Sequence, residues 1–124
     1  MTRLFQFRAG RCERRGQTNI VDPLPSKGLL YVEHNEDDGE LNHLCYKDLE
    51  SGAVVDDFIL FSGDASFKKV LVPNSTTARV YVLCFSSSNQ KVFYWMQDPD
   101  ASTDAAHVTR LNQLIDYDDQ MPIE

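Results

Sequence analysis

Three cysteines and three histidines are the side chains of this sequence with the richest chemistry, and their spacing forms no reactive centre. His43 and Cys45 share one face of an extended segment, but two ligands do not make a zinc site. No Cys-x-x-Cys pair is present, which argues against a structural zinc site or a disulfide framework. We therefore expect inert thiols, no metal or other cofactor, and no enzymatic activity. An enzyme whose active site shows no local motif stays an alternative.

Sites for ions are also poorly supported by the sequence. Residues 35–40 resemble a calcium loop only superficially, because the sixth position lacks the required glycine and the twelfth position holds Tyr46. The basic run of Arg11, Arg14 and Arg15 could hold an anion such as an inositol phosphate. The net charge of −7 opposes long-range attraction to an anionic membrane or to nucleic acid. We expect neither as a partner, and a phosphoinositide-binding module that uses these three arginines is the alternative function.

The composition is that of an ordinary soluble domain. The chain has 124 residues, of which 42% are hydrophobic and 25% are charged, so we expect one domain over residues 1–124. No run approaches the roughly 18 apolar residues of a membrane span, and the N-terminus lacks the apolar stretch of a secretory signal. The odd number of cysteines fits a reducing compartment. A cytoplasmic and nuclear location is therefore expected.

Short runs of β-branched and aromatic residues recur between Gly, Asn, Asp, Ser and Pro, a pattern typical of an antiparallel all-β domain. The sequence predicts seven strands, over residues 4–9, 29–34, 41–47, 54–61, 67–72, 79–85 and 91–96. Within residues 79–85, Tyr81, Leu83 and Phe85 fall on the opposite side from their neighbours. Such alternation places one face of a strand in the core.

The hydrophobic period changes to that of a helix from about residue 103 to 116. Ser102 is the predicted N-cap, and Asp104 brings negative charge to the first turn. The predicted apolar stripe consists of Val108, Leu111, Leu114 and Ile115, with His107, Arg110 and Gln113 on the other side. The elements together predict a mainly β fold, a pleckstrin-homology-like seven-stranded antiparallel sandwich or barrel capped by one C-terminal helix.

Three polar turns should lie at one end of such a sheet. They follow the second, fourth and sixth predicted strands, at residues 34–40, 62–66 and 86–90. Leu41, Phe61 and Phe85 stand beside them, and we expect these side chains to project together as an exposed apolar patch. Acidic residues surround it, among them Asp64 and the run from Glu36 to Glu40. The patch would suit a partner whose apolar surface is ringed by Lys and Arg. The alternative is that both phenylalanines turn inward and close the core.

Several motifs spread over nearly the whole chain resemble one known family. They are Phe7-Arg8-Ala9-Gly10, Lys27-Gly28-Leu29-Leu30-Tyr31, His43-Leu44-Cys45-Tyr46-Lys47-Asp48, Asp56-Asp57-Phe58-Ile59-Leu60-Phe61, Arg79-Val80-Tyr81-Val82-Leu83 and Phe93-Tyr94-Trp95-Met96-Gln97-Asp98-Pro99. The sequence is similar in these stretches to the Pru domain (pleckstrin-like receptor for ubiquitin) of the proteasomal ubiquitin receptor, or adhesion-regulating molecule, family.

This resemblance implies that the chain binds ubiquitin and ubiquitin chains through the same three turns. The implied ubiquitin-binding residues are Leu41, Phe61, Gly63, Asp64 and Phe85. Of two adjacent family aspartates in the middle turn, Asp64 is kept and Gly63 replaces the other. That replacement removes one polar contact.

The resemblance also implies a second surface, which docks the C-terminal tail of a large non-ATPase scaffold subunit of the proteasome regulatory particle. The implied contacts are Thr18, Val70, Arg79, Lys91, Phe93 and Trp95. The alternative for Phe93 and Trp95 is simple core packing. Many family members continue into a helical domain that recruits a deubiquitinase, and no such domain is expected within residues 1–124. We therefore expect a non-catalytic adaptor that tethers ubiquitinated substrates to the proteasome.

Overall fold

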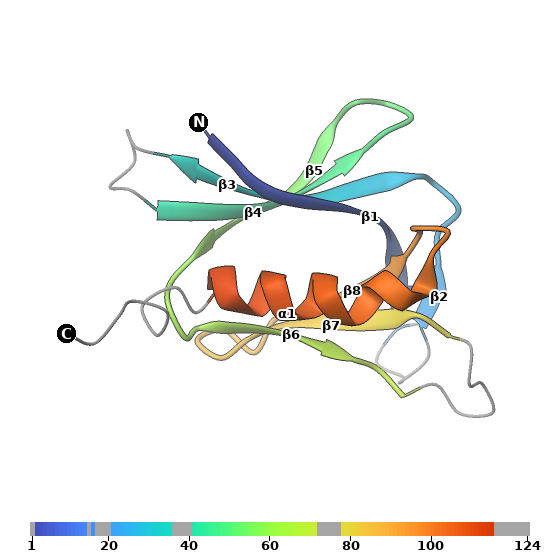
Figure 1. The fold of residues 1–124 in the computed structure, drawn as a ribbon. Coiled ribbons are helices and arrows are strands. Elements are labelled where there is room, and N and C mark those ends of the chain that lie inside the picture. The colour runs from blue at the N-terminus through green and yellow to red at the C-terminus, as the bar shows by residue number, and fades with distance from the viewer. Residues whose placement is uncertain (1, 15, 17–20, 36–40, 72–77, 116–124) are drawn as a thin grey trace.

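The computed structural model describes residues 2–14, 16, 21–35, 41–71 and 78–115 of the chain. These residues form eight strands, which are β1 (Thr2–Arg14), β2 (Val21–Pro23), β3 (Gly28–Asn35), β4 (Leu41–Asp48), β5 (Val54–Leu60), β6 (Ala65–Lys69), β7 (Val80–Phe85) and β8 (Lys91–Met96). A 3₁₀ turn, η1 (Ala101–Thr103), and the helix α1 (Asp104–Ile115) follow them (Figure 1).

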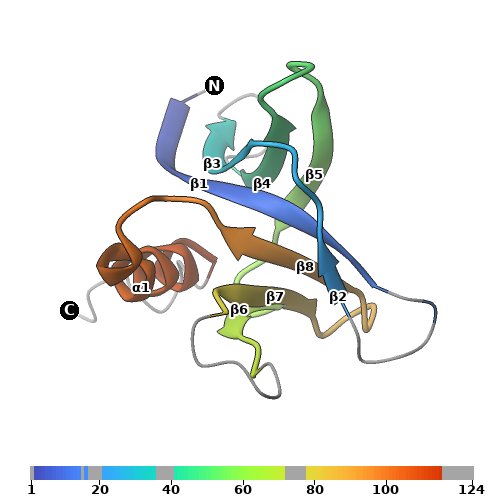
Figure 2. The same cartoon turned by 90° about the vertical axis from the view of Figure 1, so that its right-hand side faces the viewer.

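The long strand β1 belongs to both halves of the sheet. The strand order is β5-β4-β3-β1-β8-β7-β6, with every pair antiparallel. Thr2–Arg8 of β1 pair with β3, Ala9–Arg11 pair with β8, and Cys12–Arg14 pair with β2. Figure 2 shows β1 passing between the β3–β4–β5 half and the β6–β7–β8 half. The two halves face each other, and buried side chains from both of them form the core.

The predicted mainly β, pleckstrin-homology-like fold with one C-terminal helix is confirmed, with two differences in the sheet. The first is an eighth strand, β2, whose three residues end in a proline and are too few to show alternation. The second is that the sheet does not close into a barrel, because β5 and β6 lie at its two ends.

The helix α1 covers the space between the two halves of the sheet (Figure 1). Leu111, Leu114 and Ile115 are buried, as predicted, because their spacing places them on one side of the helix. Asn112 joins the helix to β6 in the manner of a neighbouring strand. Its Nδ2 donates to the carbonyl of Phe67 and its Oδ1 accepts from the Phe67 N–H, both at 2.9 Å. The outer edge of β6 is thereby satisfied at that residue.

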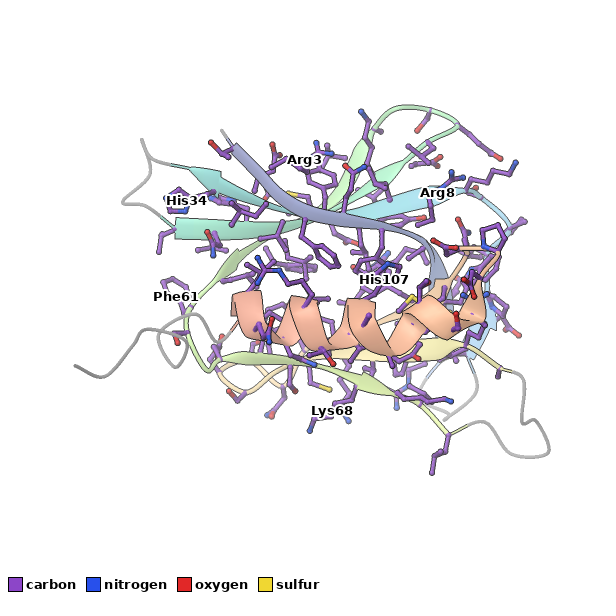
Figure 3. All side chains as sticks on the ribbon, in the orientation of Figure 1. Arg3, Arg8, His34, Phe61, Lys68 and His107 are labelled. Atoms are coloured by element: carbon purple, nitrogen blue, oxygen red, sulfur yellow. The ribbon has the colours of Figure 1, made fainter. Side chains whose placement is uncertain are left out.

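The helix begins differently from the prediction. Asp100, and not Ser102, is the N-cap, because its carboxylate accepts from the Ser102 N–H at the start of η1. Asp104 lies in the first turn of α1, as predicted. The placement of His107 on the polar side was wrong. Its ring stacks on Phe7 with centroids 5.1 Å apart, and Figure 3 shows it between α1 and β1.

Replacing Asn112 with leucine should lower the free energy of unfolding by about 1–3 kcal/mol, because two partly buried backbone groups of Phe67 would lose their partners. Urea unfolding followed by circular dichroism measures this change. The matched control is Gln113→Leu, an exposed neighbour in the same helix, which should change stability by less than about 0.5 kcal/mol. Equal losses for the two variants would contradict the proposed role of the Asn112 amide.

Candidate interaction surfaces

The β3–β4, β5–β6 and β7–β8 turns lie at one end of the sheet, on the left in Figure 1. Leu41 begins β4 opposite Asn35, and the next residue pairs with Leu60 of β5. Leu41 and Phe61 therefore stand side by side at the ends of neighbouring strands. Phe61 is 56% exposed, whereas Leu41 is half-buried. Figure 3 shows Phe61 at the same end of the molecule as His34.

The third apolar residue of this end, Phe85, does not project into solvent. It is 8% exposed, and its ring packs on Phe58 with centroids 5.0 Å apart. The expectation of three protruding side chains was therefore wrong for Phe85. The reason is the register of β7, because Phe85 shares the core face with Tyr81 and Leu83. Phe61, flanked by Leu41, forms the exposed apolar centre of this end, and Phe85 closes the core beneath it.

Asp64 connects the β5–β6 turn to the β7–β8 turn. Its Oδ1 accepts from the Ser87 N–H at 2.9 Å and from the Ser86 hydroxyl at 3.1 Å, and its Oδ2 accepts from the Ser87 hydroxyl at 2.9 Å. The Asp64 carbonyl also accepts from the Ser86 N–H at 2.8 Å. Hydrogen bonds from Ser87 and Ser86 to the ionised carboxylate lower the pKa of Asp64.

Gly63 occupies the bend of the middle turn. Its φ of 78° lies in the left-handed region that favours glycine, and the Asp64 N–H closes the turn on the Phe61 carbonyl at 3.0 Å. The backbone thus explains why a glycine suits this position, where the resemblance places an aspartate. The acidic run at 36–40, which was predicted to surround the apolar patch, lies outside the described residues.

Four residues of the predicted second surface share the outer face of the β6–β7–β8 half. On β8, Val92, Tyr94 and Met96 are buried, so the alternate positions point outward. Those positions are Lys91, Phe93 and Trp95, and Val70 joins them through its N–H bond to the Val80 carbonyl, since Val80 pairs with Trp95. Phe93 and Trp95 are half-buried and lie outside the core cluster.

Close packing holds Trp95 against the sheet. Its Nε1 donates to the Leu24 carbonyl at 3.0 Å. A Cβ atom at Gly10, which pairs with Trp95 across β1 and β8, would collide with the indole ring. The glycine therefore makes room for a flat indole on the outer face, and the Leu24 bond fixes its orientation.

The remaining two residues of the predicted second surface are not placed on this face. Arg79 precedes Val80 and falls on the opposite side, where its guanidinium donates to both carboxylate oxygens of Asp104 at 2.6 and 2.7 Å. The bond to Asp104 raises the pKa of Arg79. The structure therefore assigns Arg79 to the start of α1 and separates it from Phe93 and Trp95. Thr18 lies outside the described residues.

The basic run of β1 does not form a cluster in the described part of the chain. The Nε of Arg11 lies 3.2 Å from Asp56 Oδ2, and the Tyr94 hydroxyl donates to the same oxygen at 2.9 Å. Arg14 lies three residues further along β1, so it faces the opposite side of the strand. Arg15 lies outside the described residues. The engagement of Arg11 inside the fold removes support from the phosphoinositide alternative.

His43 and Cys45 share a strand face, as predicted, and Asp57 of β5 is their neighbour. His43 Nδ1 lies 2.8 Å from Asp57 Oδ1. Burial, with a smaller contribution from the Asp57 charge, raises the pKa of Cys45 to about 12. Burial likewise raises the pKa of Cys12 to about 11. Both thiols are therefore protonated at neutral pH, which is unfavourable for a nucleophile.

Two further features were searched for in the described residues. No group of three or more His, Cys, Asp or Glu side chains there is arranged to hold a metal ion. None of the described helical segments has the length and apolar character needed to span a bilayer.

Comparison with known proteins supplies independent information. The family described as "Proteasome complex subunit Rpn13, Pru domain" matches residues 4–108. The chain is 41% identical over 112 residues to Proteasomal ubiquitin receptor ADRM1-B of Xenopus laevis and 40% identical over 112 residues to Proteasomal ubiquitin receptor ADRM1 of Homo sapiens. It is 45% identical over 111 residues to Proteasomal ubiquitin receptor ADRM1 homolog of Drosophila melanogaster. Each alignment covers 90% of this chain and 26% or 27% of the relative, so the chain spans about a quarter of their length.

Alkylation of the native protein by iodoacetamide should modify Cys84 first, because Cys12 and Cys45 are buried. At pH 8 a thiol with a pKa of about 11 is ionised in only about one molecule in a thousand, so Cys12 should react slowly and Cys45 more slowly still. Both rates should rise as the pH approaches the raised pKa values. Peptide mass spectrometry over time measures them, with the urea-unfolded chain as control. Equal rates for Cys45 in the native and unfolded chains would contradict its burial.

Proposed function

The chain belongs to the Rpn13 Pru-domain family of proteasome subunits, and from that premise we propose that it binds ubiquitin at the end of the sheet where Phe61 is exposed. The proposed contact residues are Leu41, Phe61, Gly63, Asp64 and Phe85. Three relatives are themselves named as proteasomal ubiquitin receptors. The observation that carries the proposal is the 56% exposure of Phe61 between two turns that Asp64 holds together.

The contact residues have different roles in this proposal. Phe61 is the apolar anchor, since a large exposed aromatic ring beside a half-buried leucine can fill a shallow apolar pocket on a partner. Phe85 contributes from beneath by supporting Phe58 and the end of β7. The net charge of −7 favours encounter with a partner surface rich in Lys and Arg, mainly through the association rate.

A second proposed surface anchors the domain to the proteasome. We propose that the outer face of β7 and β8, with Phe93, Trp95 and Lys91, receives the extended C-terminal tail of a large non-ATPase scaffold subunit. Two aromatic side chains on one strand face offer flat apolar contacts to an extended peptide, and Lys91 adds a positive charge. Val70 borders this face. Arg79 is not among the proposed contacts, because its guanidinium is bound to Asp104 on the other side.

The two proposed surfaces together describe a non-catalytic adaptor. Ubiquitin or a ubiquitin chain on a substrate would be held at one end of the sheet, while the scaffold tail is held on the outer face of one half. Such tethering raises the effective concentration of the substrate at the degradation machinery. A cytoplasmic and nuclear location remains part of the proposal, supported by the free state of all three cysteines.

Replacing Phe61 with alanine should weaken ubiquitin binding by about 2 kcal/mol, or roughly thirtyfold, because the exposed ring is the proposed anchor. Titration of ubiquitin into the isotopically labelled chain, followed by NMR, measures the affinity and locates the contacts. Val54→Ala is the matched control, since Val54 is comparably exposed at 52% but lies at the other end of β5. Equal affinities of the Phe61→Ala and unmodified chains would refute the proposed site.

Replacing Phe93 with alanine should weaken binding of a synthetic peptide with the scaffold-tail sequence by about tenfold, because the ring is part of the proposed docking face. Isothermal titration calorimetry measures this loss. The two sites provide reciprocal controls, since Phe61→Ala should bind the peptide normally and Phe93→Ala should bind ubiquitin normally. Loss of both activities in either single variant would show that the surfaces are not separate.

A further inference from the structure

The carboxylate of Asp64 is largely occupied by bonds within the chain. A carboxylate offers about four acceptor positions on its two oxygens. Here the Ser87 N–H, the Ser87 hydroxyl and the Ser86 hydroxyl occupy three of them, at 2.9 to 3.1 Å. All three donors belong to the β7–β8 turn, whereas Asp64 belongs to the β5–β6 turn. The side chain therefore bridges two segments that lie 22 and 23 residues apart in the sequence.

We infer that Asp64 is a positioning residue for the proposed ubiquitin site, where its carboxylate holds the β7–β8 turn against the β5–β6 turn and so fixes Phe61 relative to Phe85. This inference rests on the proposed function, and it gives Asp64 a role that differs from a direct contact with ubiquitin. Charge-assisted hydrogen bonds of this kind are stronger than neutral ones, so an ionised aspartate suits the task.

The surrounding backbone explains why this tie matters at this point. The ladder between β6 and β7 ends at the pair of Ala65 and Phe85. Beyond it, the β7–β8 turn is closed by the Phe85 N–H bond to the Gln90 carbonyl, and Asn89 has a positive φ of 57°. The bonds to Asp64 therefore hold the turn to the neighbouring strand where regular pairing stops. A turn held in its binding conformation loses less entropy when a partner binds.

The serines separate the two possible roles of Asp64. The double variant Ser86→Ala/Ser87→Ala removes both hydroxyl donors and leaves the aspartate charge in place. If Asp64 acts through the turn, this variant should bind ubiquitin about five- to tenfold more weakly. If Asp64 instead contacts ubiquitin directly, its carboxylate would be freer in this variant, and the affinity should be unchanged or higher.

The deciding experiment is a double-mutant cycle on ubiquitin affinity, measured by NMR titration with Asp64→Ala, Ser86→Ala/Ser87→Ala and the triple variant. We expect the triple variant to bind no more weakly than the weaker of the other two, because all three residues act as one unit. Ser87→Thr, which keeps a hydroxyl, should bind nearly normally. Additive losses in a chain that still binds ubiquitin would overturn this inference alone. Absence of binding by the unmodified chain would overturn the proposed function, and the inference with it.

A readout without ubiquitin tests the tie itself. The Ser87 amide shift should follow the protonation of Asp64, and the tie should be lost as the pH falls through the lowered pKa of that carboxyl. The shift should lose this dependence in Asp64→Ala. Asp100→Ala is the matched control, since Asp100 binds the Ser102 N–H in a similar way before η1. It should leave both ubiquitin affinity and the Ser87 titration unchanged. A Ser87 amide indifferent to Asp64 would overturn the inference.

Discussion

One strand joins the two halves of the sheet, because β1 is paired with β3 along its first part and with β8 further on. The change of partner occurs near Gly10, where the absent side chain leaves space for the Trp95 indole. Both proposed surfaces depend on this arrangement. Trp95 is part of the outer face that crosses β8, and the facing of the two halves brings Phe58 of β5 against Phe85 of β7. Neither half has a complete core without the other.

Residue alternation was sufficient to locate most of the strands, because a period of two is a local property of the sequence. The residues of β8 alternate over their whole length, and its bounds were predicted correctly. The same reasoning contained the evidence that Phe85 is buried, since it shares a strand face with Tyr81 and Leu83. The expectation of an exposed ring gave more weight to the neighbouring polar turn than to this register.

Long-range polar partners could not be predicted in this way. Arg79 and Asp104 lie 25 residues apart, and the sequence contains no local sign that the guanidinium binds at the start of a helix. Arg11 resembled a free surface cation for the same reason, until the fold placed Asp56 beside it. The structure thereby reassigns two arginines from binding roles to internal ones, and it leaves the proposed surfaces more apolar than the sequence indicated.

The position of β5 at one end of the strand order has a consequence for the behaviour of the chain in solution. Its outward side chains Val55 and Ile59 are 51% and 42% exposed, and an open strand edge of this kind can recruit a strand from another copy. Asp57 lies between them, so two copies paired around it would bring like charges together. Self-association is therefore restrained by electrostatic repulsion. That restraint is weakest near the isoelectric point of about 4.8, where intermolecular sheets and precipitation are most favoured.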